Sequence, residues 1–390
     1  MRWTPAATLM MTLAAMTLPG CGGDPAAPDP IVLTGMFTLS GDNEDIQSRR
    51  ATRLAIRDIN AGGGIRIAGG RRPLRVAFVD DRADPQVGVQ RANEILSRPE
   101  TIALLGPGKS QVAVPVGAVA ERSGIPMISP TSTNPATTRG RRFVFRTTFT
   151  DDVQGAIAAR FARSRLHAST AAIAYEATSL YSAGLARSFR REFAGTGGRV
   201  VSASYTVDQG DHTAPIERLA RHRPDVLYLP NASPDVEWQA ERARRRGLDA
   251  TLLGGDAWNL NRYREIPGFD GSYATGLWFP DSRSARSRRF TSAFQTAYGI
   301  PPTGNGAAAY DAVHLLARAI TAAGTTEPEA IRDALDAITV YDGVAGRFVY
   351  ARGGDPRTGA VVVRIKAGGA AVAARYPATQ AVRPAAKERR

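Results

Sequence analysis

The sequence of 390 residues contains a single cysteine, Cys21, so no disulfide bond can form within the chain. It also contains few lysines: of the 50 lysines and arginines only three are lysines, and the other 47 are arginines spread over most of the chain. The net charge of +14 is therefore dispersed, without the interleaved aromatic residues that stack on bases. We expect no nucleic-acid partner.

Motifs that would carry catalysis or bind a metal are lacking as well. The four histidines share no metal-ligand spacing, and the sequence has neither a G-x-S-x-G motif nor the cysteine–histidine arrangement of a nucleophilic enzyme. The histidines are His167, His212, His222 and His314. We therefore expect a protein without a metal, a cofactor or an enzymatic activity.

The apolar run at residues 6–16 is shorter than the about 20 residues needed to cross a bilayer. With Arg2 before it and Leu18-Pro19-Gly20-Cys21 after it, the run resembles the signal peptide and lipobox of bacterial lipoproteins. The resemblance implies that residues 1–20 are removed and that Cys21 is acylated. Residues 21–30 would then form a flexible tether between a bacterial membrane and an extracytoplasmic, periplasmic or cell-surface domain. The alternative is an ordinary secretion signal in which the cysteine has no role.

What the sequence does contain is an alternation of short β-rich runs with segments whose apolar residues recur at helical spacing. This alternation predicts parallel sheets flanked by helices, and it restarts once along the chain. We therefore expect an α/β protein with two doubly wound parallel-sheet domains and a cleft between them. The predicted strands are 31–37, 74–79, 101–105 and 125–129, then 171–175, 199–205, 226–230 and 251–254, and finally 347–350 and 360–366. The first predicted helices are 50–60, 85–97 and 111–123.

The segment 58-DINAGGGIRIAGGRRPLRVAFVDDRADP-85 closely resembles the substrate-binding proteins of ABC transporters with the type I periplasmic-binding-protein fold. The leucine/isoleucine/valine-binding proteins are the most similar. The resemblance continues, in the same order, through 124-GIPMISPTSTNP-135, 143-FVFRTT-148, 181-YSAGLARSF-189, 225-DVLYL-229 and 253-LGGDAW-258. It therefore covers nearly all of the chain after the tether.

The resemblance also implies a division into two lobes joined by a hinge. The N-terminal lobe would comprise residues 31–147 plus 277–343, and the C-terminal lobe residues 148–276 plus 344–377. Three crossings would connect them, near 146–148, 275–277 and 342–345, and a basic tail would follow at 378–390.

The stretch Gly106-Pro107-Gly108-Lys109-Ser110 resembles the end of a nucleotide-binding P-loop. A Walker motif needs a glycine five positions before Gly108, where this chain has Ala103. Pro107 also removes one of the N–H groups that would have to surround the phosphates. A nucleotide hydrolase is thus an alternative, but a strand, a turn and a helix N-terminus also make a site for a carboxylate.

In the resembled family this loop binds the α-carboxylate of the ligand through a serine, which falls on Ser110. The family's second carboxylate-binding segment falls on Thr131 and Thr133. A tyrosine from the other lobe falls on Tyr181, and the acidic residue that accepts the ligand's ammonium group falls on Asp256. The resemblance thus implies a site for a small zwitterion.

The chain departs from the family in the side chains that surround this site. The aromatic residue that follows strand 226–230 in the family falls on Ala232, and Trp258 is expected to replace the lost aromatic surface. The loop at 41–45 is acidic and lacks the relatives' tyrosine, which would favour a ligand with an additional cation. The family's small disulfide is absent, with Ala83 and Lys109 at its positions.

Together these features predict a lipid-anchored, monomeric binding protein that takes an amino acid or a similar small zwitterion to the permease of an ABC importer. A ligand sensor that signals to a membrane receptor would use the same fold, and it remains an open alternative.

Overall fold

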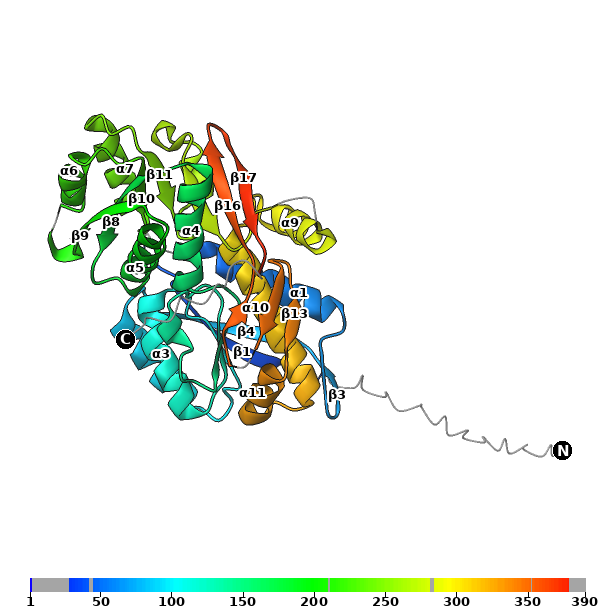
Figure 1. The fold of residues 1–390 in the computed structure, drawn as a ribbon. Helices are drawn as coiled ribbons and strands as arrows, with labels where there is room; N and C mark the ends of the chain where they lie inside the picture. Colours follow the sequence, from blue (N-terminus) through cyan, green and yellow to red (C-terminus); the bar gives the residue numbers. More distant parts are fainter. Residues whose placement is uncertain (2–27, 42–44, 210, 281–283, 352, 379–390) are drawn as a thin grey trace.

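A computed structural model describes residues 1, 28–41, 45–209, 211–280, 284–351 and 353–378. The predicted signal peptide, Cys21, residues 42–44 of the acidic loop and all but one residue of the basic tail lie outside the described residues. At the end of the predicted tether, the carbonyl groups of Asp29 and Pro30 accept hydrogen bonds from Arg72 at 2.6 and 3.4 Å. The described chain forms two lobes, each built around a sheet (Figure 1).

The first lobe contains a sheet of five strands whose neighbours are all parallel. In spatial order they are β4 (Leu74–Asp80), β1 (Ile31–Phe37), β5 (Leu104–Leu105), β6 (Met127–Ser129) and β7 (Val144–Arg146). Strand β1 is buried almost throughout, because helices cover a parallel sheet on both faces. The helices of this lobe are α1 (Ile46–Ala61), α2 (Pro85–Leu96), α3 (Ser110–Ser123), α9 (Ala285–Tyr298), α10 (Gly304–Ala323) and α11 (Pro328–Asp336).

Local signals explain where these helices begin and end. Helix α2 starts where the Asp84 side chain accepts the N–H groups of Gln86 and Val87, with Pro85 at the first helical position. Helix α3 ends at Gly124, which adopts the left-handed conformation that glycine reaches without strain.

The second lobe contains a sheet of seven strands. In spatial order they are β17 (Gly369–Tyr376), β16 (Ala360–Lys366), β12 (Tyr273–Gly276), β11 (Thr251–Gly254), β10 (Val226–Leu229), β8 (Thr170–Glu176) and β9 (Arg199–Tyr205). The pairings from β9 to β12 are parallel, whereas β16 and β17 are antiparallel additions. The helices of this lobe are α4 (Asp151–Arg165), α5 (Leu180–Gly195), α6 (Ala214–Ala220), α7 (Asp235–Arg245) and α8 (Leu260–Tyr263). Two doubly wound α/β sheets are present, as predicted.

The third crossing lies later in the chain than predicted. Strands β13 (Val340–Asp342), β14 (Arg347–Tyr350) and β15 (Pro356–Arg357) form one small sheet, which keeps residues 344–357 with the first lobe. The N–H group of Arg146, at the end of β7, also donates to the Gly354 carbonyl at 3.0 Å. The chain therefore crosses at residues 358–359, because the pairing of β14 with β13 prevents an earlier transfer to the second sheet.

Each sheet has one point at which the order of strands reverses. In the first lobe it lies between β1 and β5, and in the second between β8 and β10. Ligands of open α/β sheets bind outside the carboxyl ends of the strands at such points. The loops that follow these four strands are therefore the first places to examine for a site.

Candidate ligand-binding site

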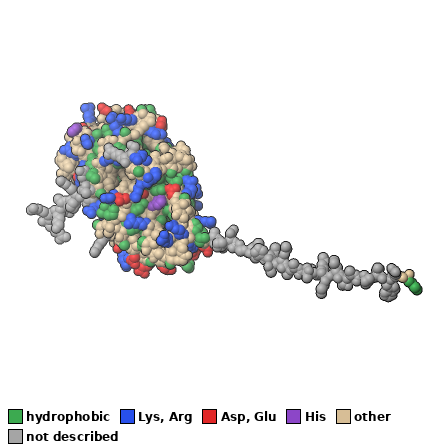
Figure 2. All heavy atoms as spheres, turned by 90° about the vertical axis from the view of Figure 1, so that its right-hand side faces the viewer, with side chains coloured by type: hydrophobic (Ala, Val, Ile, Leu, Met, Phe, Trp, Pro, Cys, Tyr) green, Lys and Arg blue, Asp and Glu red, His purple; other side chains and the backbone are tan. Residues whose placement is uncertain are grey.

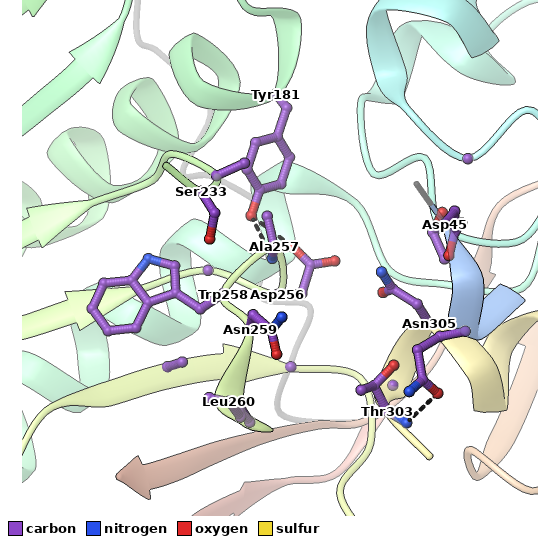
Figure 3. A pocket seen from close by; sticks show the side chains of 18 of the residues that line it. Asp45, Tyr181, Ser233, Asp256, Ala257, Trp258, Asn259, Leu260, Thr303 and Asn305 are labelled. Atoms are coloured by element: carbon purple, nitrogen blue, oxygen red, sulfur yellow. Dashed lines mark hydrogen bonds between the residues drawn. The ribbon is translucent and has the colours of Figure 1, made fainter. Parts of the chain in front are cut away.

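A cleft of about 1180 Å³ lies between the lobes and is bordered by the loops at both reversal points. The first lobe contributes Thr38, Gly108, Lys109, Ser110 and Thr131, among others. The second lobe contributes Glu176, Tyr181, Asn231, Ser233, Asp256 and Asn259. Figure 3 shows Tyr181 and Asp256 on one side of this space and Asp45, Thr303 and Asn305 on the other.

On the first lobe the cleft meets the N-terminus of α3. Lys109 is the N-cap residue, and its side chain makes no capping hydrogen bond. The first N–H groups of a helix have no partner within the helix, so they and the helix dipole favour an anion here. Ser110 stands in the same turn, and its hydroxyl accepts hydrogen bonds from Ser132 Oγ at 3.2 Å and from the Asn134 N–H at 3.4 Å. This wall therefore offers donors to a carboxylate.

Close packing within the protein explains the two glycines of the P-loop-like stretch, Gly106 and Gly108. Gly106 has φ of +88°, and a Cβ there would lie 2.0 Å from the Met36 carbonyl oxygen. A Cβ on Gly108 would lie 2.5 Å from Thr131 Oγ1. Gly106 is thus required by a close backbone contact, and Gly108 leaves room for the Thr131 side chain, which explains both glycines without a bound phosphate.

Lys109 lies at the border of the cleft near two carboxylates. Burial lowers the pKa of the Lys109 ammonium, and the negative charges of Asp81 and Asp45 oppose that shift. Asp81 is itself buried and accepts a hydrogen bond from Thr38 Oγ1 at 2.8 Å. These neighbours offset most of the charge that Lys109 brings to this wall.

The loop that contains Thr131 is held by a buried arginine that the sequence analysis did not single out. Arg146 is completely buried and donates to the carbonyl groups of Ser132 and Asn134 at 2.7 and 2.8 Å. Its Nε also lies 2.7 Å from Asp355 Oδ1. Planar guanidinium groups suit such fixed multiple contacts, so Arg146 holds the segment that contains Ser132 and Asn134 in position.

On the second lobe Asp256 follows β11 and faces the cleft. Its Oδ1 accepts hydrogen bonds from Tyr181 Oη at 2.8 Å and Gln154 Nε2 at 2.9 Å. Burial raises the pKa of Asp256, and these two hydrogen bonds act in the opposite direction. The backbone N–H of Ala257 in turn donates to Tyr181 Oη at 3.2 Å. A partly buried carboxylate in this position would be stabilised by a cationic ligand group.

Thr133 does not reach the cleft as predicted. It is completely buried, and its carbonyl accepts the N–H of Asp151 at 2.8 Å at the start of α4. Among the residues that the structure describes, the Thr133 hydroxyl makes no hydrogen bond of normal geometry. The physical reason is that the chain turns into the interior directly after Thr131, so that Ser132 and Thr133 are both completely buried.

Trp258 borders the cleft, but most of its ring belongs to the core of the second lobe. It is 4% exposed, packs edge-on against Tyr263 and Phe269, and donates its indole N–H to the Leu229 carbonyl at 3.0 Å. The ring also covers Gly254, where a Cβ would lie 1.9 Å from it. Trp258 therefore supports the loop that carries Asp256 and offers little aromatic surface to a ligand.

Three polar residues of the second lobe, Glu176, Ser182 and Asn231, were missed because nothing in their local sequence distinguishes them. Asn231 accepts hydrogen bonds from Ser182 Oγ at 2.6 Å and from the Glu176 N–H at 3.2 Å. These contacts join the loops after β8 and β10 at the reversal point of the sheet. Their position there, rather than a motif, is the signal that would have identified them.

Within the described ranges, no group of three or more histidine, cysteine, aspartate or glutamate side chains could hold a metal ion. The helices in those same ranges include none with the length and apolar character of a membrane span. On the face shown in Figure 2, arginine and lysine side chains are scattered among polar and apolar ones.

Comparisons with known proteins agree with this arrangement. The family described as periplasmic binding protein matches residues 32–370. The Leu/Ile/Val-binding protein BraC3 of Rhizobium johnstonii is 30% identical over 333 residues, which cover 83% of this chain and 86% of that protein. The leucine-, isoleucine-, valine-, threonine-, and alanine-binding protein of Pseudomonas aeruginosa is 27% identical, with coverage of 89% and 92%.

Solved structures show the same fold. A leucine-binding protein from Thermotoga maritima superposes with a TM-score of 0.82 at 24% identity, covering 89% of this chain and 99% of that one. A solute-binding protein from R. palustris in complex with benzoate gives a TM-score of 0.78 at 20% identity, with coverage of 89% and 97%. The predicted type I periplasmic-binding-protein fold is confirmed.

Proteins of this family bind solutes outside the cytoplasm and are not enzymes, in agreement with the predictions of no catalytic activity and an extracytoplasmic location. The chain therefore belongs to the periplasmic binding proteins, as an ABC-transporter substrate-binding protein of the leucine/isoleucine/valine-binding type.

Proposed function

We propose that this protein captures an amino acid or a similar small zwitterion in the cleft between its lobes. The observation that carries the proposal is the opposition of two walls of different chemistry. The N-terminus of α3 with Ser110 offers hydrogen-bond donors, and Asp256 on the other lobe offers a carboxylate. One ligand with a carboxylate and an ammonium group satisfies both walls at once.

In the bound state the ligand carboxylate would accept hydrogen bonds from Ser110, from the first N–H groups of α3 and from Thr131. The ligand ammonium would bind Asp256, with the Tyr181 hydroxyl beside it. Because burial raises the pKa of Asp256, an ammonium group in contact would restore its ionised form. We assign no ligand contact to the Thr133 hydroxyl, and Trp258 acts as a support beneath Asp256.

Contacts on both walls would also drive the lobes to close. A ligand stabilises whichever conformation it contacts more extensively, so binding to two lobes favours the closed one. Typical small-molecule pockets measure about 300–1,000 Å³, and the cleft of about 1180 Å³ is larger. That size fits a conformation that has yet to close on its ligand.

The closed protein would deliver its ligand to the permease of an ABC importer, acting as a monomer tethered by a lipid on Cys21. The relatives named for branched-chain amino acids support the transport role. A sensor that reports occupancy to a membrane receptor is the second candidate, and a failure of permease vesicles to take up a bound ligand would favour it.

The test is to measure binding of amino acids, matching amides and simple carboxylates to the purified protein by calorimetry. Benzoate belongs in the panel because a structural neighbour binds it. We expect an amino acid to bind. Asp256→Asn should lower its affinity about 100-fold, because a charged hydrogen bond is lost, and Ser110→Ala should lower it about 10-fold, because a neutral one is lost. Small-angle scattering should show a smaller radius of gyration with ligand present.

Asp249→Asn is the matched control, since Asp249 is exposed and lies outside the cleft lining. Carboxylates that bind as tightly as amino acids, with no dependence on Asp256, would replace the zwitterion by a simple acid. Absence of binding by every compound in the panel would refute the proposed ligand class.

A further inference from the structure

We propose that the outer end of the cleft holds a second subsite, which binds the aromatic end of an elongated amino-acid ligand. Three side chains form it: Tyr205, His212 and Trp238, together called the aromatic platform. All three border the same cleft as Asp256. The proposal rests on the proposed function, because it extends a ligand whose zwitterionic end lies between Ser110 and Asp256.

The aromatic platform is a set of rings in mutual contact. The ring centroids of Tyr205 and His212 lie 5.1 Å apart with an interplanar angle of 29°, and those of His212 and Trp238 lie 5.8 Å apart at 54°. Tyr205 is 1% exposed, whereas Trp238 is 46% exposed. The outermost ring therefore presents open aromatic surface, and the rings behind it fix its surroundings.

Hydrogen bonds hold Tyr205 and His212, the two inner rings of the platform, in place before any ligand arrives. Asp235 accepts from the Tyr205 hydroxyl and lies 2.7 Å from His212 Nδ1. The His212 carbonyl accepts from Gln239 at 2.9 Å, and Gln239 in turn accepts from Asn231 at 2.8 Å. A ring that is already positioned loses little conformational entropy on binding, which makes a rigid aromatic surface effective in recognition.

The order of strands gives the distance between the two ends of the cleft. Asp256 follows β11 and Tyr205 ends β9, and β10 and β8 lie between them. Neighbouring strands are about 4.8 Å apart, so three spacings put Tyr205, the innermost ring of the platform, roughly 14 Å from the end of β11. Trp238 lies on α7 (Asp235–Arg245), which follows β10, and its ring contacts His212 in front of Tyr205. An ordinary amino acid is too short to contact both ends.

The path between the two ends is open and polar. Small residues flank Asp256, namely Gly255 and Ala257, and Ala232 borders the cleft as well. Glu176 and Ser233 also border the path. A polar linker such as an amide or carbamate suits this stretch, and an apolar ring suits its end.

The charges at the platform favour an uncharged ring. The carboxylate of Asp235 already has the Tyr205 hydroxyl and His212 as partners, so it offers little to a ligand cation. Aromatic pairs gain energy beyond the area they bury, through offset or edge-to-face contacts. The ligand class is thus an α-amino acid whose side chain is extended through a polar linker to an aromatic ring.

Three probes test this subsite in calorimetry with the full chain: norleucine, Nε-acetyl-lysine and Nε-benzyloxycarbonyl-lysine. In Nε-benzyloxycarbonyl-lysine about nine bonds of roughly 1.5 Å join the Cα atom to the aromatic ring, and this length spans most of the distance to the platform. We expect it to bind the unaltered protein at least 10-fold more tightly than Nε-acetyl-lysine. Trp238→Ala should remove most of that advantage, Trp238→Phe should retain about half of it on a logarithmic scale, and norleucine should be unaffected.

Val340→Ala is the control, since Val340 is an exposed apolar residue outside the cleft lining. Equal affinities of the two lysine derivatives, or a Trp238→Ala variant that weakens all three probes alike, would overturn the subsite. If norleucine binds and depends on Asp256 while the ring adds nothing, only the subsite fails. If no probe binds, the proposed function fails first, and the subsite fails with it.

Discussion

At the scale of single residues, Asp151 is an unusual feature of the second lobe. It is 1% exposed, and neither of its carboxyl oxygens makes a hydrogen bond of normal geometry among the residues that the structure describes. Burial raises the pKa of Asp151 to about 8, with the Asp256 charge adding to the shift and the Thr133 hydroxyl and Arg146 opposing it. The folded protein therefore binds a proton that the unfolded chain releases near pH 4.

From the proton bound at Asp151 we predict how Asp151→Asn changes the thermal stability of the protein. Between pH 4 and pH 8 Asp151 holds its proton in the folded state and has lost it in the unfolded state. The contribution of Asp151 to the free energy of unfolding therefore falls as the pH rises. The amide does not titrate, so the variant should unfold several degrees higher than the original protein at pH 8. The difference should shrink toward zero near pH 4. Thermal unfolding followed by circular dichroism across this range measures both quantities.

Asp152→Asn is a suitable control for that series, because the Asp152 side chain is 53% exposed and pairs with Arg191 at the surface. It should change the melting temperature little at any pH. A variant at Asp151 that is less stable than the original at pH 8 would show that the buried carboxylate is ionised and well compensated.

Residue identity alone predicted only some of the side chains that reach the cleft. Ser110, Thr131, Tyr181 and Asp256 border it, since each lies beyond the carboxyl end of a parallel strand, after β5, β6, β8 and β11 respectively. Thr133 and Trp258 differ because their side chains turn into the interior, and which loop residue turns inward depends on tertiary packing that local sequence does not record.

At the scale of elements, the loop between β5 and α3 contains two glycines whose substitutions should have different effects. A Cβ at Gly108 would lie too close only to Thr131 Oγ1, the end of a side chain that can rotate away, and it would be in ordinary contact with Asp45 Oδ2 at 3.4 Å. Gly108→Ala should therefore leave the melting temperature nearly unchanged but weaken ligand binding about 10-fold by displacing a carboxylate donor.

Gly106→Ala serves as the comparison for the same loop. Its φ of +88° and its 2.0 Å approach to the Met36 backbone leave no room for a side chain. This change should lower the melting temperature by several degrees, because backbone cannot rotate away as a side chain does. Equal stability of the two variants, or unaltered binding by Gly108→Ala, would contradict the role assigned to the close contact with Thr131.

Elements were predicted well wherever an apolar run and its flanking turns occur together, as in β1, β9 and β11. The sequence did not predict equally well which sheet a strand near the C-terminus joins. Strands β14 and β16 both look like short apolar strands, yet one pairs in the small sheet of the first lobe and the other pairs with β12. That choice depends on partners distant in sequence, which local periodicity does not record.

At the scale of the whole molecule, the proposed attachment of the protein to a membrane depends on Cys21. The lone cysteine after a short apolar run is the observation behind the lipid tether. We expect the unaltered protein to partition into the detergent phase of cell extracts and to carry acyl chains on its N-terminus by mass spectrometry. Cys21→Ser should move it to the aqueous phase while ligand affinity stays the same. An N-terminus processed elsewhere and free of lipid would favour the ordinary secretion signal.

Arg146 connects this whole-molecule view with the loop of the first lobe. It ends β7 immediately before the first crossing, and the same side chain contacts the Ser132 and Asn134 carbonyls and Asp355, just ahead of the third crossing. The buried Arg146 side chain thus contacts the chain close to two of the three connections between the lobes, and it also holds the segment proposed to bind the ligand carboxylate. We therefore expect the donors of this segment to keep their position in the first lobe when the lobes close, so that Asp256 moves toward a ligand that the first lobe already holds.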